Sequence, residues 1–166
     1  MRSPEPGQRK RRRSSWNQLE ISKRWTRNSG VKRILLDTNA YAAFKTGDQD
    51  AVEIIRGVET VGISTIVLGE LLGGFSAGQR EAENRRQLTI FFESPRVSVF
   101  AVDETTAEFY AHAYISLRRK GKPIPTNDLW VAATALQHGL AIFSYDKHFL
   151  EVEGVIVGRR PEDFLP

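Results

Sequence analysis

Short apolar runs that alternate with helix-like patterns constrain the fold of this chain more than any other feature of its sequence. The runs fall at residues 34–36, 61–65, 97–102, 140–143 and 155–157, and we expect each to form a strand. Short strands separated by helices favour a parallel sheet that is covered on both faces. The sequence therefore predicts an α/β fold, a three-layer α/β/α domain with a short-stranded, mostly parallel central sheet.

The first helices are predicted from apolar spacing and from the residues that end a helix. One helix starts within residues 37–39, directly after the first apolar run. A second helix buries one face, formed by Ala51, Ile54, Ile55 and Val58. Residues 66–72 are expected to form a helix that Gly73 and Gly74 terminate.

Three further helices are predicted in the second half of the chain. Residues 79–93 form a helix with Leu88, Phe91 and Phe92 on its apolar side, and Pro95 prevents its continuation. Asp103 caps a long helix that ends before Gly121. The predicted buried stripe of that helix comprises Ala107, Tyr110, Ala111, Tyr114 and Ile115. The last helix, capped by Thr126 or Asn127 and ending at Gly139, is apolar nearly all round, so we expect it to be buried.

Composition excludes several classes of site. The 166 residues include no cysteine, which rules out disulfides, cysteine-ligated zinc, iron–sulfur clusters and a thiol nucleophile. No apolar run approaches the ~20 residues of a membrane span, and the basic start lacks the apolar stretch of a signal peptide. We therefore expect a cytoplasmic protein that has no membrane partner.

Positive charge is concentrated at the start of the chain. Residues 1–30 hold nine Lys or Arg and two Glu, whereas the rest of the chain is slightly acidic. This segment has too few aliphatic residues to form a core, so we predict a basic, disordered extension at 1–30 and a domain at 31–166. The run from Arg9 to Arg13 is typical of a nucleic-acid arm, but also of a solvated tail or of sequence that is not native to the domain.

Four acidic residues are placed where they can meet at one edge of the predicted sheet. Asp37 and Asp146 each follow a strand directly, Glu70 lies one turn into a helix, and Asp128 opens the buried helix. Ligands of parallel sheets bind beyond the carboxyl ends of the strands. Each acid alone also fits a cap, a turn or a solvated helix face, so the combination carries the hypothesis.

Four carboxylates in one cleft repel one another and stay ionised together only where a cation neutralises them. Oxygen ligands without cysteine or clustered histidine favour a hard divalent ion, Mg²⁺ or Mn²⁺. Such an ion keeps water ligands and leaves room for a phosphate oxygen. The sequence therefore indicates a phosphodiester substrate.

Four segments of the chain resemble the motifs of PIN-domain ribonucleases, and within that family the VapC-type toxins of prokaryotic toxin–antitoxin pairs. The segments are ILLDTN at 34–39, IVLGELLG at 66–73, IPTNDLWVAA at 124–133 and FSYDKHF at 143–149. They occur in the family's order and spacing, and the resemblance covers about residues 32–165. It implies a PIN-like fold and a metal-dependent endoribonuclease.

The resemblance also assigns roles to residues. It implies that Asp37, Glu70, Asp128 and Asp146 form an acidic quartet, with Asn39 and Ser144 as polar supports. Asp37 and Asp128 are expected to hold the principal Mg²⁺ or Mn²⁺, and Glu70 and Asp146 to complete the site. The implied partners are an RNA substrate, a second copy of the chain, and a small VapB-like antitoxin whose C-terminal segment lies over the cleft.

RNA bound at an acidic site needs basic side chains beside it. The candidates are Arg118, Arg119, Lys120, Lys122 and Lys147. The first three of these also fit the cation-rich last turn of a helix. The three histidines are not favoured as metal ligands. His148 is the best placed of them to touch substrate, because it lies two residues from Asp146, but solvent exposure is the favoured interpretation. Trp130 and Phe92 are interpreted as core residues.

Two alternative functions stay open at this point. The chain could be a catalytically silent PIN scaffold that binds RNA or a protein partner. It could also be a phosphorelay or phosphatase-like domain with Asp37 as phosphoryl acceptor. Haloacid-dehalogenase-type enzymes require a second aspartate two positions after the first, and Asn39 occupies that position.

Overall fold

The computed structural model describes residues 30–166 of the chain. The strands are β1 (Arg33–Leu36), β2 (Thr60–Ser64), β3 (Val97–Phe100), β4 (Ala141–Phe143) and β5 (Val157–Gly158). The helices are α2 (Thr38–Thr46), α3 (Gln49–Gly57), α4 (Thr65–Ala77), α5 (Glu81–Phe92), α6 (Glu104–Arg119), α7 (Thr126–His138), the 3₁₀ helix η1 (His148–Glu151) and α8 (Pro161–Phe164). The prediction made for residues 1–29 lies outside the described residues.

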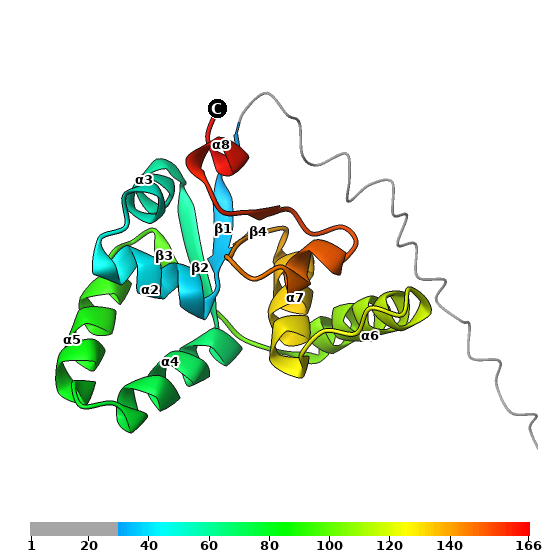
Figure 1. Cartoon of the computed structure of the whole chain (residues 1–166), viewed down its shortest axis with the longest axis horizontal. Helices are drawn as coiled ribbons and strands as arrows, with labels where there is room; N and C mark the ends of the chain where they lie inside the picture. The colour runs from blue at the N-terminus through cyan, green and yellow to red at the C-terminus, as the bar shows by residue number, and fades with distance from the viewer. Residues whose placement is uncertain (1–29) are drawn as a thin grey trace, which may run out of the picture.

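The strands form one parallel sheet in the order β3-β2-β1-β4-β5. Every pairing within residues 30–166 is parallel, and Leu36 at the end of β1 is in register with Ile63 of β2 and Phe143 of β4. Right-handed crossovers place α2 to α5 on one face, and the return from β3 to β4 places α6 and α7 on the other (Figure 1). The predicted three-layer α/β/α fold is confirmed.

The centre of the sheet is the centre of the core. Ile34, Leu35 and Leu36 of β1 are fully buried, as are the three residues of β4. Helix α7 buries Leu129, Val131 and all three of its alanines, which confirms the prediction of a buried helix. The helix begins at Thr126 without a side-chain cap, so the expected cap by Thr126 or Asn127 is absent, and it ends at Gly139 in the left-handed conformation.

The buried stripe of α6 differs from the prediction. Thr106, Ala113 and Leu117 are the buried residues of this helix. Tyr114 and Ile115, expected inside, are 42% and 45% exposed, and Ala107 and Ala111 are exposed as well. The true stripe begins with Thr106 because its hydroxyl lies between Asp103 at the N-cap and Gln137 of α7, and this network fixes the rotation of α6.

The bounds of three elements also differ from the sequence-based prediction. Helix α4 does not end at Gly73 and Gly74 but continues to Ala77, and its N-terminus is capped by the buried hydroxyl of Ser64. β3 ends at Phe100 rather than at residue 102, and β5 covers Val157–Gly158 rather than 155–157. Helix α8 was not predicted, because a helix of four residues has no apolar period that could reveal it.

An arginine ties the edge of the sheet to a helix. The Arg96 guanidinium, next to β3, donates to the backbone carbonyls of Ile55, Arg56 and Val58 at the end of α3. Ahead of β1, the backbone N–H of Val31 donates to the Phe164 carbonyl, and α8 packs against α3 and β5. In the part of the chain that the structure describes, no helix is both long and apolar enough to cross a membrane.

Candidate active site

The candidate site lies beyond the carboxyl ends of β1 and β4. Asp37 follows β1 and caps α2, and its carboxylate is only 6% exposed. Four donors surround it: the backbone N–H and hydroxyl of Thr38 at 2.8 and 3.4 Å, the Asn39 amide at 2.6 Å and the Ser144 hydroxyl at 2.7 Å. The buried carboxylate is therefore fixed in orientation by its neighbours.

Ser144 connects Asp37 to the loop that follows β4. Its fully buried hydroxyl donates to Asp37 and accepts from the backbone N–H of Asp146 at 2.9 Å. Asn39 lies beside it, with its amide 3.2 Å from the Ser144 oxygen and its carbonyl accepting from the backbone N–H of Tyr145 at 3.0 Å. The sequence-predicted residues Asp37, Asn39, Ser144 and Asp146 are thus brought together by a continuous set of hydrogen bonds.

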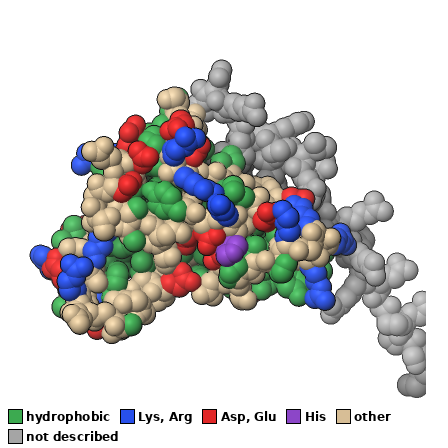
Figure 2. Space-filling model, in the orientation of Figure 1, with side chains coloured by type: hydrophobic (Ala, Val, Ile, Leu, Met, Phe, Trp, Pro, Cys, Tyr) green, Lys and Arg blue, Asp and Glu red, His purple; other side chains and the backbone are tan. Residues whose placement is uncertain are grey.

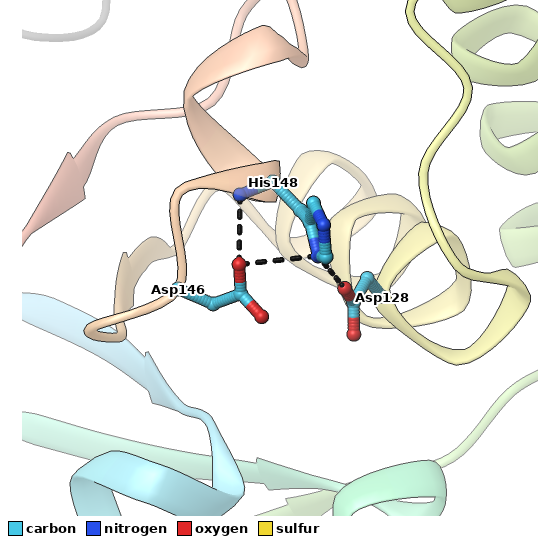
Figure 3. A group of neighbouring side chains, drawn as sticks. All are labelled: Asp128, Asp146 and His148. Carbon is cyan, nitrogen blue, oxygen red and sulfur yellow. Dashed lines mark hydrogen bonds and ion pairs between the residues drawn. The ribbon is translucent and has the colours of Figure 1, made fainter.

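Asp128, Asp146 and His148 form a compact group of possible metal ligands. One ligand atom from each lies within 4.8 Å of the others. The Nδ1 atom of His148 is 2.8 Å from Asp128 Oδ2 and 3.1 Å from Asp146 Oδ1 (Figure 3). Figure 3 shows the imidazole between the two carboxylates, with Asp128 on α7 and the other two on the segment after β4.

The electrostatics of this group follow from its burial and its charges. Desolvation raises the pKa of the Asp128 carboxyl, the hydrogen bond from His148 lowers it, and the negative charges of Asp146 and Asp37 raise it further. The net direction is upward, so the ionised carboxylate is disfavoured at this position. A cation bound here would offset that cost.

Glu70 reaches the site from the opposite side. It projects from α4, and its carboxylate accepts a hydrogen bond of 2.7 Å from the Asn127 amide at the start of α7. Glu70 and Asp37 are not members of the compact ligand group found in residues 30–166. Of the four predicted acids, Asp128 and Asp146 therefore lie in one group, Asp37 is joined to Asp146 through Ser144, and Glu70 contacts the residue before Asp128.

The predicted RNA-contacting cations have different environments. Lys122 binds both carboxylate oxygens of Glu151, and Lys120 pairs with Glu153 at 2.8 Å. The remaining three, Arg118, Arg119 and Lys147, are exposed, and the Arg118 guanidinium donates to the Tyr114 hydroxyl. Figure 2 shows acidic side chains and a histidine in the middle of the viewed face, with basic side chains on either side.

Two residues contribute more to the site than their sequence context indicates. His148 is 48% exposed at its side chain, as expected, and its imidazole also contacts both Asp128 and Asp146, which the sequence did not indicate. Asn127 was considered only as a helix cap, whereas its amide contacts Glu70. Of the two residues interpreted as core, Phe92 is half-buried and packs against the core, whereas Trp130 is half-buried, lies outside the core and packs on Tyr110 with ring centroids 4.2 Å apart.

This donor set fits a divalent cation. Two carboxylates and an imidazole nitrogen converge at one point, and the anchored carboxylate of Asp37 adds a further negative charge nearby. Carboxylate and imidazole donors bind Mg²⁺, Mn²⁺ and other divalent metals. The arrangement can hold such an ion next to a solvent-accessible surface on which a phosphodiester could bind.

Comparison with known proteins identifies relatives over most of the chain. The family model described as PIN domain matches residues 34–155. Ribonuclease VapC4 of Mycobacterium tuberculosis is 34% identical over 128 residues, which cover 76% of this chain and 96% of that protein. Ribonuclease VapC2 of Rickettsia felis is 29% identical over 128 residues, covering 74% and 94%.

Solved structures give the same relationship at the level of the fold. The crystal structure of VapBC2 from Rickettsia felis bound to a DNA fragment from their promoter matches with a TM-score of 0.68 and 25% identity, covering 75% of this chain and 96% of that one. FitAcB from Neisseria gonorrhoeae matches with a TM-score of 0.61 and 28% identity, covering 76% and 96%. The similarity thus extends over nearly the full length of each relative.

Proposed function

Because this chain belongs to the PIN-domain family, we propose that it is a metal-dependent ribonuclease that acts as the toxin of a type II toxin–antitoxin system. One observation carries the proposal: Asp128, Asp146 and His148 converge within 4.8 Å of one another beside the buried Asp37. The relatives named ribonuclease VapC support the RNA substrate, and the solved VapBC complexes support the role as a toxin.

The family resemblance suggests roles for the acidic residues. Asp37 and Asp128 would hold the principal ion, and Asp146 and Glu70 would complete its surroundings directly or through water. Bound Mg²⁺ or Mn²⁺ supplies positive charge that polarises the scissile phosphate and lowers the pKa of a coordinated water. Asn39 and Ser144 fix the orientation of the Asp37 carboxylate, so that it meets the ion without reorganisation.

The chain's own groups also handle the proton and the substrate. A carboxylate of the site accepts the proton of the attacking water during in-line displacement, and the family resemblance implies products with a 3′-hydroxyl and a 5′-phosphate. Of the proposed RNA-contacting cations, Lys147 is exposed and adjacent in sequence to Asp146. Arg118 and Arg119 extend this surface along α6, while Lys120 and Lys122 must exchange their ion pairs with Glu153 and Glu151 for phosphate contacts.

The decisive experiment compares cleavage of total RNA by the wild type, by Asp37→Asn and by the matched control Asp50→Asn. Asp50 is an exposed acid in the first turn of α3, outside the site. We expect cleavage with Mg²⁺ or Mn²⁺ that EDTA abolishes, a loss of ~100-fold or more in Asp37→Asn, and no change in the control.

Cleavage by Asp37→Asn at the wild-type rate would contradict the proposed site. RNA binding by the wild type without any cleavage would instead favour the alternative of a catalytically silent scaffold.

We propose two protein partners as well. The first is a small antitoxin whose C-terminal segment covers the site and inserts an arginine near Glu70 or Asp37, because a planar guanidinium binds carboxylates through two hydrogen bonds and competes with the ion. A structure of the complex with the site left open would reject this. The second partner is another copy of the chain, and the molar mass of the protein in solution tests whether this dimer forms.

A further inference from the structure

We propose that His148 supplies an imidazole nitrogen to the metal site, and that this nitrogen makes the site prefer Mn²⁺ to Mg²⁺. The inference rests on the proposed function and extends it to the identity of the ion. It concerns a residue that lies outside the acidic quartet, and it is carried by the position of one nitrogen atom.

The ligand atoms of the group are spaced as a bound ion requires. His148 Nδ1 lies 2.8 Å from Asp128 Oδ2 and 3.1 Å from Asp146 Oδ1. In an octahedral site with metal–ligand bonds near 2.1 Å, neighbouring ligand atoms are about 3 Å apart. An ion can therefore replace the hydrogen bonds between these three side chains with small shifts.

The backbone around His148 holds the imidazole in place. The N–H of His148 donates to Asp146 Oδ1 at 2.9 Å, and the N–H of Asp146 donates to the buried Ser144 hydroxyl. The next residue, Phe149, is fully buried and anchors η1. The side chain is thus fixed at its base on both sides, although its ring is half exposed, and its Nδ1 faces the two acids (Figure 3).

The chemistry of the donor atoms bears on which ion is preferred. The compact group offers an ion one imidazole nitrogen beside two carboxylates, so nitrogen is one of its three protein ligand atoms. Imidazole favours transition metals over Mg²⁺, whose preferred ligands are oxygen atoms, and Mn²⁺ is a transition metal that shares with Mg²⁺ the preference for carboxylates and water.

The test is pulsed electron paramagnetic resonance of the full chain loaded with Mn²⁺, which detects the hyperfine coupling of a directly bound ¹⁴N nucleus. The variants are His148→Gln and His148→Ala, and the matched control is His112→Gln, which changes an exposed histidine on α6. Calorimetric titration of each protein with Mn²⁺ and with Mg²⁺ gives the affinities, and RNA cleavage in Mg²⁺ is measured on the same preparations.

We expect nitrogen coupling in the wild type and in the control, and its loss in both His148 variants. The variants should bind Mn²⁺ roughly 10-fold or more weakly while their Mg²⁺ affinity changes little. Wild-type protein that binds Mn²⁺ and cleaves RNA but shows no nitrogen coupling would overturn the inference and leave the proposed function standing. Wild-type protein that neither binds a divalent ion nor cleaves RNA would overturn both.

Discussion

Asn127 joins the two sides of the candidate site through one hydrogen bond to Glu70. Because this bond spans α4 and α7, we expect it to set the direction of the Glu70 carboxylate. Asn127→Ala should lower kcat by roughly 10-fold with little change in KM, as for other residues that orient a ligand. The measurement is steady-state cleavage of a short RNA.

Asn84→Ala is the matched control, since Asn84 makes a similar side-chain bond, to Lys45, on α5 outside the site. Asn127→Ala with wild-type kinetics would mean that Glu70 needs no partner or takes no part in catalysis.

Asp128 links the site to the pH dependence of stability. Burial and neighbouring negative charges raise the pKa of its carboxyl in the folded protein. Between the pKa of this carboxyl in the unfolded chain and its higher pKa in the folded protein, the folded state binds more protons than the unfolded state. The stability that Asp128 contributes at low pH is therefore lost as the pH rises through its pKa in the folded protein. Without metal, Asp128→Asn should melt at a higher temperature than the wild type at pH 7.

That difference should shrink as the pH falls below the ordinary pKa of a carboxyl group. Thermal melts in EDTA across a pH series measure this difference in melting temperature. The control, Asp50→Asn, should keep the melting temperature of the wild type. A lower melting temperature of Asp128→Asn at pH 7 would show that the charged carboxylate stabilises the metal-free fold.

Residue type and position along the chain were enough to propose the four acids, because each follows a strand or lies in the opening turns of a helix, whereas Asn39 and Ser144 were implied by the family resemblance. The contacts of His148 and Asn127 were not visible in the sequence. His148 meets Asp128 across 20 residues, and Asn127 meets Glu70 across 57. Contacts between residues so far apart in the chain depend on how the helices pack against the sheet, which no local sequence pattern encodes.

At the scale of elements, the glycines of α4 show why a helix end is difficult to predict. Gly73 and Gly74 disfavour a helix intrinsically, yet α4 passes through them because Leu71 and Phe75 on either side are packed into the core. A Cβ atom added at Gly73 would meet nothing within 4 Å. Gly73→Ala should therefore stabilise the protein by roughly 0.5–1 kcal/mol, as measured by urea denaturation.

Gly139→Ala serves as the control, because the same substitution at this position should lower the stability of the protein. The Gly139 φ of 61° at the end of α7 lies in the left-handed region, where alanine is strained, although the space around it is open. Gly139→Ala should destabilise the protein by about 1 kcal/mol or more. If Gly73→Ala were destabilising too, α4 would depart from regular helical geometry at that residue.

The stripe of α6 was mispredicted for a different reason. Two apolar sets on this helix both satisfy the helical period, and the sequence could not rank them. The polar network of Thr106, Asp103 and Gln137 decides the rotation. Polar contacts between helices thus select among apolar patterns that are equally regular.

At the scale of the whole molecule, the alternation of strands and helices predicted the parallel sheet but not its strand order, and the domain beginning at residue 31 can be tested directly. Val31 pairs with Phe164, and the described core contains no residue before it. Residues 31–166 preceded by a methionine should fold and cleave RNA at the rate of the full chain. Cleavage and RNA affinity are measured for both chains at two salt concentrations.

We expect the salt dependence of RNA affinity to be the same for both chains. If residues 1–30 bind RNA, the shorter chain will bind more weakly, and its salt slope will fall by roughly 0.7 for each phosphate that it no longer neutralises. A shorter chain that does not fold would show that the domain begins before residue 31.

The guanidinium of Arg96 has a consequence for how the molecule opens. It closes the last turn of α3 from a position about 40 residues further along the chain, and β3 begins at the very next residue. The end of the helix cannot fray without releasing the start of the edge strand, and the strand cannot detach without exposing three helix carbonyls. In amide hydrogen exchange, these two distant segments will therefore behave as one cooperative unit with a shared opening free energy.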